Sequence, residues 1–208
     1  VINSSAFAEL FFVYNEVIMK TGILLTIALL GAPLASAYDL VADQSTLTVT
    51  SIKSGSFAEN HSFSGLTGSL QSDGGVVVSV PLDSIWTGIG IRDERMRKYL
   101  FDVANNPAAN FSAKVMNMSD IAAMEVGESL LMTIDGEFAL NSAIQNIPVA
   151  IRVTKQADHS LRATTVTPVI INAAAFGYAD GIAKLQELAG LPSIATAVPV
   201  TFSIVFSD

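Results

Sequence analysis

Alternation of apolar and polar residues runs through most of the chain after residue 38 and constrains the fold more than any other feature. Successive side chains of an extended strand point to opposite faces, so a period of two predicts strands that bury one face. Ile147, Val149 and Ile151, for example, share one face of such a strand. The predicted strand faces cover residues 47–51, 57–70 (one or two strands), 76–82, 111–115, 130–140, 147–153, 161–171 and 198–206.

These segments predict an all-β protein with about eight antiparallel strands, because the turns between them are short and rich in Gly, Asp and Asn. Such strands can stack as a sandwich or close as a barrel, and closure removes exposed edges. The chain has no internal repeat and no low-complexity linker, so the alternating region forms one domain.

Two segments break the alternation and predict short helices, at residues 92–103 and 181–191. The first places apolar residues on one face, and its acidic residues precede basic ones by four, as Asp93 precedes Arg97. The second ends at a glycine, Gly190, which is a common helix stop. Each helix has an apolar face that must be covered, either across an open end of a barrel or against its outer wall.

The segment 19–37 has the pattern of a secretory signal: Lys20 at the start, a short apolar core, and the small residues Ala35-Ser36-Ala37 at the end. A transmembrane anchor is the alternative, but the apolar run is shorter than the roughly 20 residues that a spanning helix needs. We expect cleavage after residue 37. We interpret residues 1–18 as an upstream extension from a misassigned start and residues 38–208 as the mature domain, located in the periplasm.

No catalytic or metal-binding group emerges from the residues. The chain has no cysteine and a formal net charge of −8, which excludes disulfides and thiolate sites and disfavours nucleic acid as a partner. His61 and His159 are not at metal-ligand spacing, and no nucleophile elbow is present. We therefore expect no catalysis, no metal and no cofactor.

The predicted interior leaves two possibilities open. Small eight-stranded barrels are either filled by their own side chains or hold one small ligand.

Four basic residues lie within seven positions, namely Arg92, Arg95, Arg97 and Lys98. They form either a solvated helix face balanced by neighbouring acids or a cationic rim for a polar headgroup.

Short motifs with a consistent order and spacing run through nearly all of residues 38–206. They are Tyr38-Asp39, Phe63-x-Gly65-Leu66-x-Gly68, Ser84-Ile85-Trp86-Thr87, Arg92-Asp93, Leu100-Phe101-Asp102-Val103, Pro107, Phe111, Ile134-Asp135-Gly136-Glu137-Phe138-x-Leu140 and Phe176-Gly177. Together they resemble the YceI-like proteins. Two stretches depart from that pattern: Asn141-Ser142-Ala143-Ile144, and residues 178–196, which insert a helix that many relatives lack.

The resemblance implies a lipocalin-like barrel, exported to the periplasm, that binds a long polyisoprenoid lipid in its lumen for carriage or storage. The lipid would be of the isoprenoid quinone or prenyl phosphate type, and a membrane b-type cytochrome would be a partner. The alternative is a ligand-free structural barrel that acts through its outer surface on a membrane protein. The oligomeric state stays open.

On this basis we predict three groups of ligand-binding residues. The wall residues are Val78, Val80, Phe111, Ala113, Met132, Ile134, Phe138, Val149, Ile151 and Phe202. The rim residues are Trp86 and Phe101. The headgroup residues are Arg92, Arg95 and Arg97.

Overall fold

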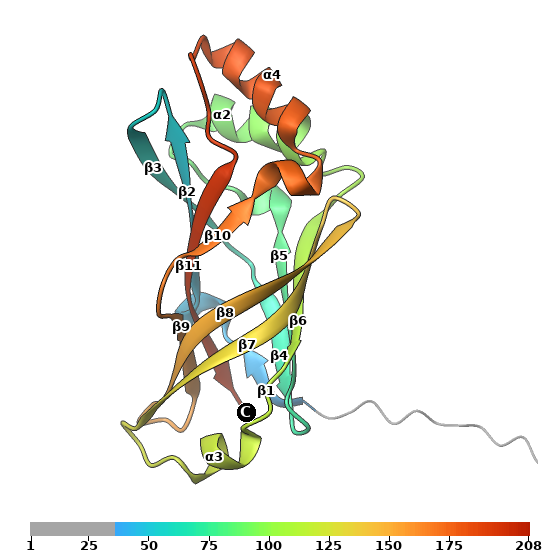
Figure 1. Ribbon diagram of the computed structural model, residues 1–208. Coiled ribbons are helices and arrows are strands. Elements are labelled where there is room, and N and C mark those ends of the chain that lie inside the picture. Colours follow the sequence, from blue (N-terminus) through green and yellow to red (C-terminus); the bar gives the residue numbers. More distant parts are fainter. Residues whose placement is uncertain (1–35) are drawn as a thin grey trace, which may run out of the picture. The chain divides into compact units, whose positions relative to one another are not determined.

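The computed structural model describes residues 36–208, which form an antiparallel barrel (Figure 1). Eight strands close the ring, because β1 pairs with β4 on one side and with β11 on the other. The remaining neighbours pair in the order β4-β5-β6-β7-β8-β9-β11. The ring consists of β1 (Ser36–Leu40), β4 (Thr67–Gln71), β5 (Gly75–Pro81), β6 (Ala108–Lys114), β7 (Ser129–Leu140), β8 (Ala143–Lys155), β9 (Leu161–Thr165) and β11 (Ala197–Ser207).

Closure confirms the barrel and decides against the sandwich. The predicted leader and extension lie outside the described residues, except for the start of β1. Among the described residues, no helix has both the length and the apolar character needed to cross a membrane.

Three further strands extend the wall beyond the ring at one end. β2 (Thr46–Lys53) and β10 (Val169–Asn172) pair with opposite edges of β11, and β3 (Phe57–Phe63) pairs with β2. The prediction of one strand over 161–171 is therefore wrong: β9 and β10 are separate. Pro168 lies between them and has no N–H to continue the ladder.

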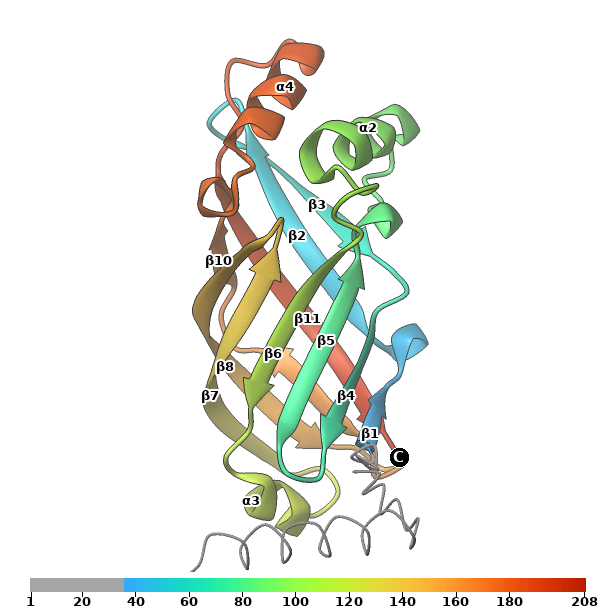
Figure 2. The same cartoon turned by 90° about the vertical axis from the view of Figure 1, so that its right-hand side faces the viewer.

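Helices occupy both ends of the barrel (Figure 2). α2 (Gly90–Arg95), the π-helix η3 (Met96–Phe101) and α4 (Ala179–Ala189) lie at the end that the β2–β3 hairpin reaches, and α3 (Met118–Ala123) lies at the opposite end. Both predicted helices are confirmed, whereas α3 was not predicted. The remaining short turns are the 3-10 helices η1 (Ala42–Gln44), η2 (Leu82–Ser84) and η4 (Ala173–Phe176).

The side-chain pairing predicted within the first helix is wrong. Asp93 is buried and accepts hydrogen bonds from the backbone N–H (2.9 Å) and the hydroxyl of Thr87. Arg97 donates to the backbone carbonyls of Asp83 (2.6 Å) and Ile85 (3.2 Å). The segment changes from α-helix to π-helix at residue 96, which alters the spacing on which a four-residue pair depends.

Close packing seats α4 against η3. A Cβ on Gly181 would lie 2.7 Å from the carbonyl oxygen of Tyr99 and 3.0 Å from Leu100 Cα, so only glycine permits this approach. A chain of aromatic rings adds to the attachment. Phe101 packs between Phe63 (6.1 Å between centroids) and Tyr178 (5.8 Å), which links β3, η3 and the start of α4.

The β7–β8 turn accounts for one departure from the YceI-like pattern. Asn141 and Ser142 both have positive φ, at 49° and 63°, as a two-residue hairpin turn of the primed type requires. The Asn141 amide also donates to the carbonyl of Phe176 at 2.8 Å. Asn141 therefore adopts the positive φ that glycine often supplies in such turns, and its side chain also connects the hairpin to η4.

Candidate functional site

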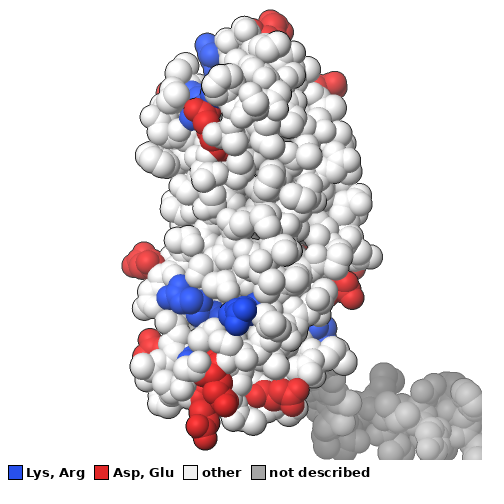
Figure 3. Space-filling model, turned by 60° about the vertical axis from the view of Figure 1, so that its left-hand side comes forward, with Lys and Arg blue, Asp and Glu red and all other residues white. Residues whose placement is uncertain are grey.

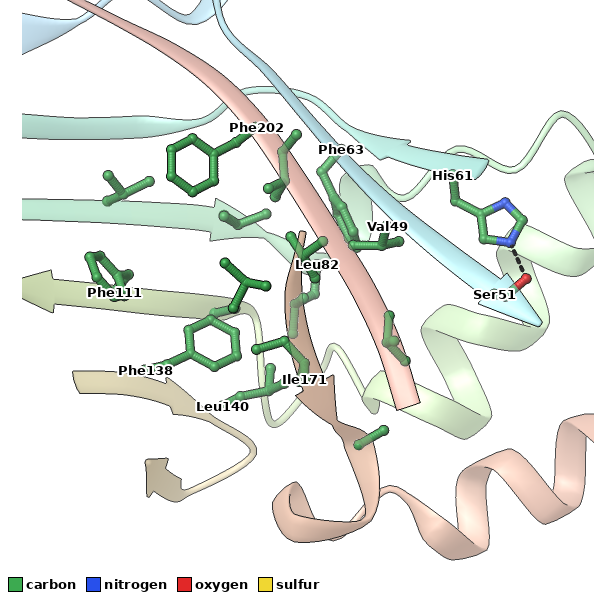
Figure 4. A pocket seen from close by; sticks show the side chains of 18 of the residues that line it. Val49, Ser51, His61, Phe63, Leu82, Phe111, Phe138, Leu140, Ile171 and Phe202 are labelled. Carbon is green, nitrogen blue, oxygen red and sulfur yellow. Dashed lines mark hydrogen bonds between the residues drawn. The ribbon is translucent and has the colours of Figure 1, made fainter. Parts of the chain in front are cut away.

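The inward faces of the strands enclose an elongated cavity of about 600 Å³ instead of a solid core. Its wall is almost entirely aliphatic and aromatic, with contributions from β2 to β11, α2, η3 and α4. Figure 4 shows part of this lining, in which Phe111, Phe138 and Phe202 lie well away from the polar pair His61 and Ser51. The structure thus favours a lumen over a filled barrel.

Most of the predicted ligand-binding residues line this cavity. Those on its wall are Val78, Val80, Phe101, Phe111, Ile134, Phe138, Val149, Ile151 and Phe202. Phe101 was predicted at the rim but is buried in the wall, because it packs between Phe63 and Tyr178. Trp86 does not line the cavity: it is 63% exposed, and its backbone pairs with Ser62 of β3.

Ala113 and Met132 pack against the core without reaching the cavity. Ala113 is short and pairs directly with Gly136, whose missing side chain leaves room for the ring of Phe111. A Cβ on Gly136 would lie 2.2 Å from Phe111 Cζ, so the ring covers the glycine. Phe111 therefore forms the wall surface at this point, where Ala113 was predicted to do so.

One end of the cavity is polar, and His61 is its buried centre. His61 is 3% exposed, and its Nε2 lies 2.8 Å from the Ser51 hydroxyl on the neighbouring strand. Its Nδ1 is buried and has no hydrogen-bond partner. Burial, assisted by the positive charge of Arg92, lowers the pKa of His61 below its ordinary value, so the imidazole is neutral at pH 7.

An ion-paired group adjoins the histidine. Lys53 and Arg92 both donate to the same carboxylate oxygen of Glu59, Arg92 at 2.7 Å. The hydrogen bond from Lys53, followed by that from Arg92, holds the pKa of Glu59 below its ordinary value. Arg92 also donates to the carbonyl of Thr87, while its buried Nε has no partner. Two cations thus share one carboxylate on the cavity wall.

Two of the three predicted headgroup residues line the cavity, and the third does not. Arg92 and Arg95 line the cavity, and Arg95 donates to the carbonyl of Leu188 at 3.2 Å. Arg97 does not line it, because its guanidinium is held by the backbone carbonyls that follow β5. Tyr178, which was not predicted, lines the cavity with a buried hydroxyl that lacks a partner. Burial raises the pKa of Tyr178 to about 12, so it stays a neutral donor.

Ser51, His61 and Tyr178 were not predicted at the polar end, where Arg92 and Arg95 were, because these three residues look ordinary in the sequence. Ser51 continues the inward face of Leu47 and Val49, and His61 shares its face with Phe63, so alternation alone places both inside. A polar residue at an inward position was the available signal. β2, β3 and α2 come together at this end only in the tertiary structure, and a local sequence pattern does not show which elements are neighbours.

The YceI-like domain family matches residues 38–206. The chain belongs to the YceI-like family. The structure shows what the residues of the family motifs contact. Thr87 donates hydrogen bonds to the buried carboxylate of Asp93, and Arg92 donates to the carbonyl of Thr87. In this YceI-like protein, these contacts fix α2 beside the cavity.

Two solved structures are similar to this YceI-like chain. One is a polyisoprenoid binding domain from Saccharophagus degradans implicated in plant cell wall breakdown, with 31% identity, coverage of 83% of this chain and 99% of that chain, and a TM-score of 0.80. The other is BcnA of Burkholderia cenocepacia, with 16% identity, coverage of 80% and 99%, and a TM-score of 0.62. The second likeness shows the fold alone. No curated protein matches the chain.

Proposed function

We propose that this YceI-like protein binds one isoprenoid lipid in its barrel and carries or stores it in the periplasm. The observation that carries the proposal is the apolar cavity with polar groups at one end only. That shape is complementary to a long apolar tail with a small polar head. The 31% identical domain from Saccharophagus degradans is described as polyisoprenoid binding, which supports the same ligand class.

The cavity volume sets the length of tail that the protein accepts. A cavity of about 150 Å³ holds benzene, so each carbon needs roughly 25 Å³. At that value the 600 Å³ cavity holds about 24 carbons, which is between four and five isoprene units. Burial contributes roughly 0.8 kcal/mol per CH₂ before the entropic costs of binding are subtracted. Affinity therefore comes mainly from the tail.

The headgroup belongs at the polar end. Three buried side-chain atoms on the cavity wall lack partners: His61 Nδ1, Arg92 Nε and the Tyr178 hydroxyl. Buried polar atoms without partners are uncommon in native proteins and call for a ligand or a water. All three can donate a hydrogen bond, so a headgroup with acceptor oxygens satisfies them. Quinones and phosphates both carry such oxygens.

The charges at this end favour the phosphate. Lys53, Arg92 and Arg95 line the cavity, and Glu59 is the one carboxylate on its wall. The wall therefore carries excess positive charge although the chain as a whole carries −8. A prenyl phosphate gains charge-assisted hydrogen bonds there, while a neutral quinone gains ordinary ones.

A binding role accounts for the site better than catalysis does. Ser51 and His61 are close enough for a nucleophile–base pair, but a triad needs a carboxylate on Nδ1 to orient the imidazole. His61 Nδ1 has no such partner. Nowhere in residues 36–208 do three His, Asp or Glu side chains cluster in a way that could hold a metal ion.

The test is extraction of the purified mature protein with organic solvent, followed by mass spectrometry. We expect one isoprenoid lipid per chain. The double variant Arg92→Gln, Arg95→Gln should keep less prenyl phosphate but retain quinone, with Lys98→Gln as a control because Lys98 does not line the cavity. A wild-type protein that yields no lipid supports the ligand-free barrel and overturns the proposal.

A further inference from the structure

The cavity opens at the end formed by β2, β3, α2, η3 and α4. Among the residues that line it, three are exposed, and all three lie at this end: Ile89, Ile91 and Ala189. At the opposite end the lining residues Val115 and Ile121 are buried. A ligand therefore has its entry beside α2, next to the polar end described above.

Exposed aromatic residues gather around this mouth. Phe57 at the β2–β3 turn is 65% exposed, Trp86 before α2 is 63% exposed, and Tyr99 on η3 is 38% exposed. They are the exposed aromatic side chains of the described residues, and none of them lines the cavity. Ile89 and Ile91 are exposed and also line the cavity, so the apolar lining continues onto the outer surface at the mouth.

Charge separates this end from the rest of the barrel. The elements β2, β3, α2, η3 and α4 contain six of the ten basic side chains of residues 38–208 but five of the seventeen acidic ones. The remaining described chain has four basic and twelve acidic side chains. Within this end, Asp93 is buried against Thr87 and Lys184 pairs with Glu187 at 2.9 Å. Figure 3 shows a broad uncharged band that separates the charged side chains near this end from those of the lower half.

We propose that the mouth rim, defined by Phe57, Trp86, Ile89, Ile91 and Tyr99, docks on the surface of a lipid bilayer that contains anionic lipid. Aromatic and aliphatic side chains beside basic ones are the groups that insert at a bilayer interface and attract anionic headgroups. Lys98 lies over the Tyr99 ring at 5.1 Å, which places a cation next to an inserting aromatic. The inference rests on the proposed function, because docking joins the bilayer interior to the lumen and lets an apolar tail pass without crossing water.

A single tryptophan makes the proposal directly testable. Trp86 is the one tryptophan of the chain and lies on the rim. The mature protein is mixed with vesicles of phosphatidylcholine containing about 30 mol% phosphatidylglycerol, and with phosphatidylcholine vesicles alone. We expect a blue shift of Trp86 emission and quenching by brominated acyl chains on the anionic vesicles, and much weaker effects on the neutral ones. High salt should weaken the response.

Matched variants separate docking from ligand binding. Phe57→Ser with Tyr99→Ser removes two rim side chains that do not touch the lumen, and Val77→Ser with Leu131→Ser removes two exposed side chains from the barrel wall. The rim variant should bind vesicles at least tenfold more weakly and transfer a fluorescent prenol between vesicles correspondingly more slowly. It should hold the same amount of prenol at equilibrium. The wall variant should behave as wild type in all three measurements.

The outcomes distinguish the docking proposal from the lipid-binding proposal. A protein that holds prenol but shows no Trp86 response to protein-free vesicles overturns docking alone, and leaves a protein partner or diffusion through water as the route. Emission that is already blue-shifted without vesicles and depends on protein concentration shows that the rim pairs with a second copy instead. A protein that binds vesicles but extracts without lipid contradicts the proposed function. Equal vesicle binding by the rim and wall variants also overturns docking at this face.

Discussion

Adjacent valines on β5 allow the lumen to be tested with one substitution repeated at two positions. Val78 lines the cavity, whereas Val77 points outward and is 50% exposed. Val78→Trp adds about seven non-hydrogen atoms, or roughly 175 Å³ at 25 Å³ per atom. That is close to a third of the 600 Å³ cavity. The ring therefore displaces about seven carbons of a bound tail.

The expected loss of affinity follows from that displacement. Seven carbons at roughly 0.8 kcal/mol each set an upper limit of about 6 kcal/mol, and the tail recovers part of it by shifting towards the mouth. We expect at least a hundredfold weaker binding of a geranylgeranyl ligand, about 2.8 kcal/mol. Val77→Trp should bind as wild type, because its ring lies outside the barrel.

Stability of the ligand-free protein gives the second half of the test. If the lumen is empty space, the Val78→Trp ring enters it without displacing side chains, and the free energy of unfolding changes by less than about 1 kcal/mol. If the interior is a packed core, overpacking costs typically 1–3 kcal/mol. Isothermal titration and urea unfolding of both variants measure the two quantities. A strongly destabilised Val78→Trp with unchanged ligand affinity would refute the lumen.

Affinity for prenols should rise with each isoprene unit and level off near four to five units, as a titration series from C10 to C40 would show; continued gain at C40 contradicts the volume argument. Gly136→Ala should lower the melting temperature and the lipid capacity together, because the new Cβ forces the Phe111 ring towards the lumen. Because the pKa of His61 is lowered in the folded protein, the unfolded chain binds the imidazole proton at a higher pH than the folded chain does, so the free energy of unfolding should fall as the pH drops below about 6.5. Urea unfolding from pH 7.5 to 5 measures this dependence, and His61→Gln should flatten it. An unchanged pH dependence in the variant contradicts a lowered pKa of His61.

Much of the barrel follows from local pattern. Each strand of β5 to β8 was predicted within a few residues, because a half-buried strand must alternate to keep one face out of water. α4 was predicted because its apolar stripe and Gly190 stop are local signals, and Gly190 indeed has a φ of 62° at the end of the helix. The prediction failed where one long pattern hid a break, between β9 and β10, and where a short strand or helix carried too few residues to show a period, as in β1 and α3.

The sequence by itself determined that this protein is a β structure with polar residues outside and apolar residues inside. It also determined that two helices have an apolar face to bury, since both features depend on the spacing of residues along the chain. Only the tertiary structure decided which inward residues meet at the same place. His61, Arg92 and Tyr178 lie on separate elements, yet all three line one cavity. Arg97 does not line the cavity, although residues on either side of it in the sequence do, because its guanidinium donates to the carbonyl of Asp83. A strand pattern reports the face on which a side chain lies but not its depth or its neighbours across the barrel. Ring closure through β1 and β11 sets those, because the register of every strand pair must be satisfied at once.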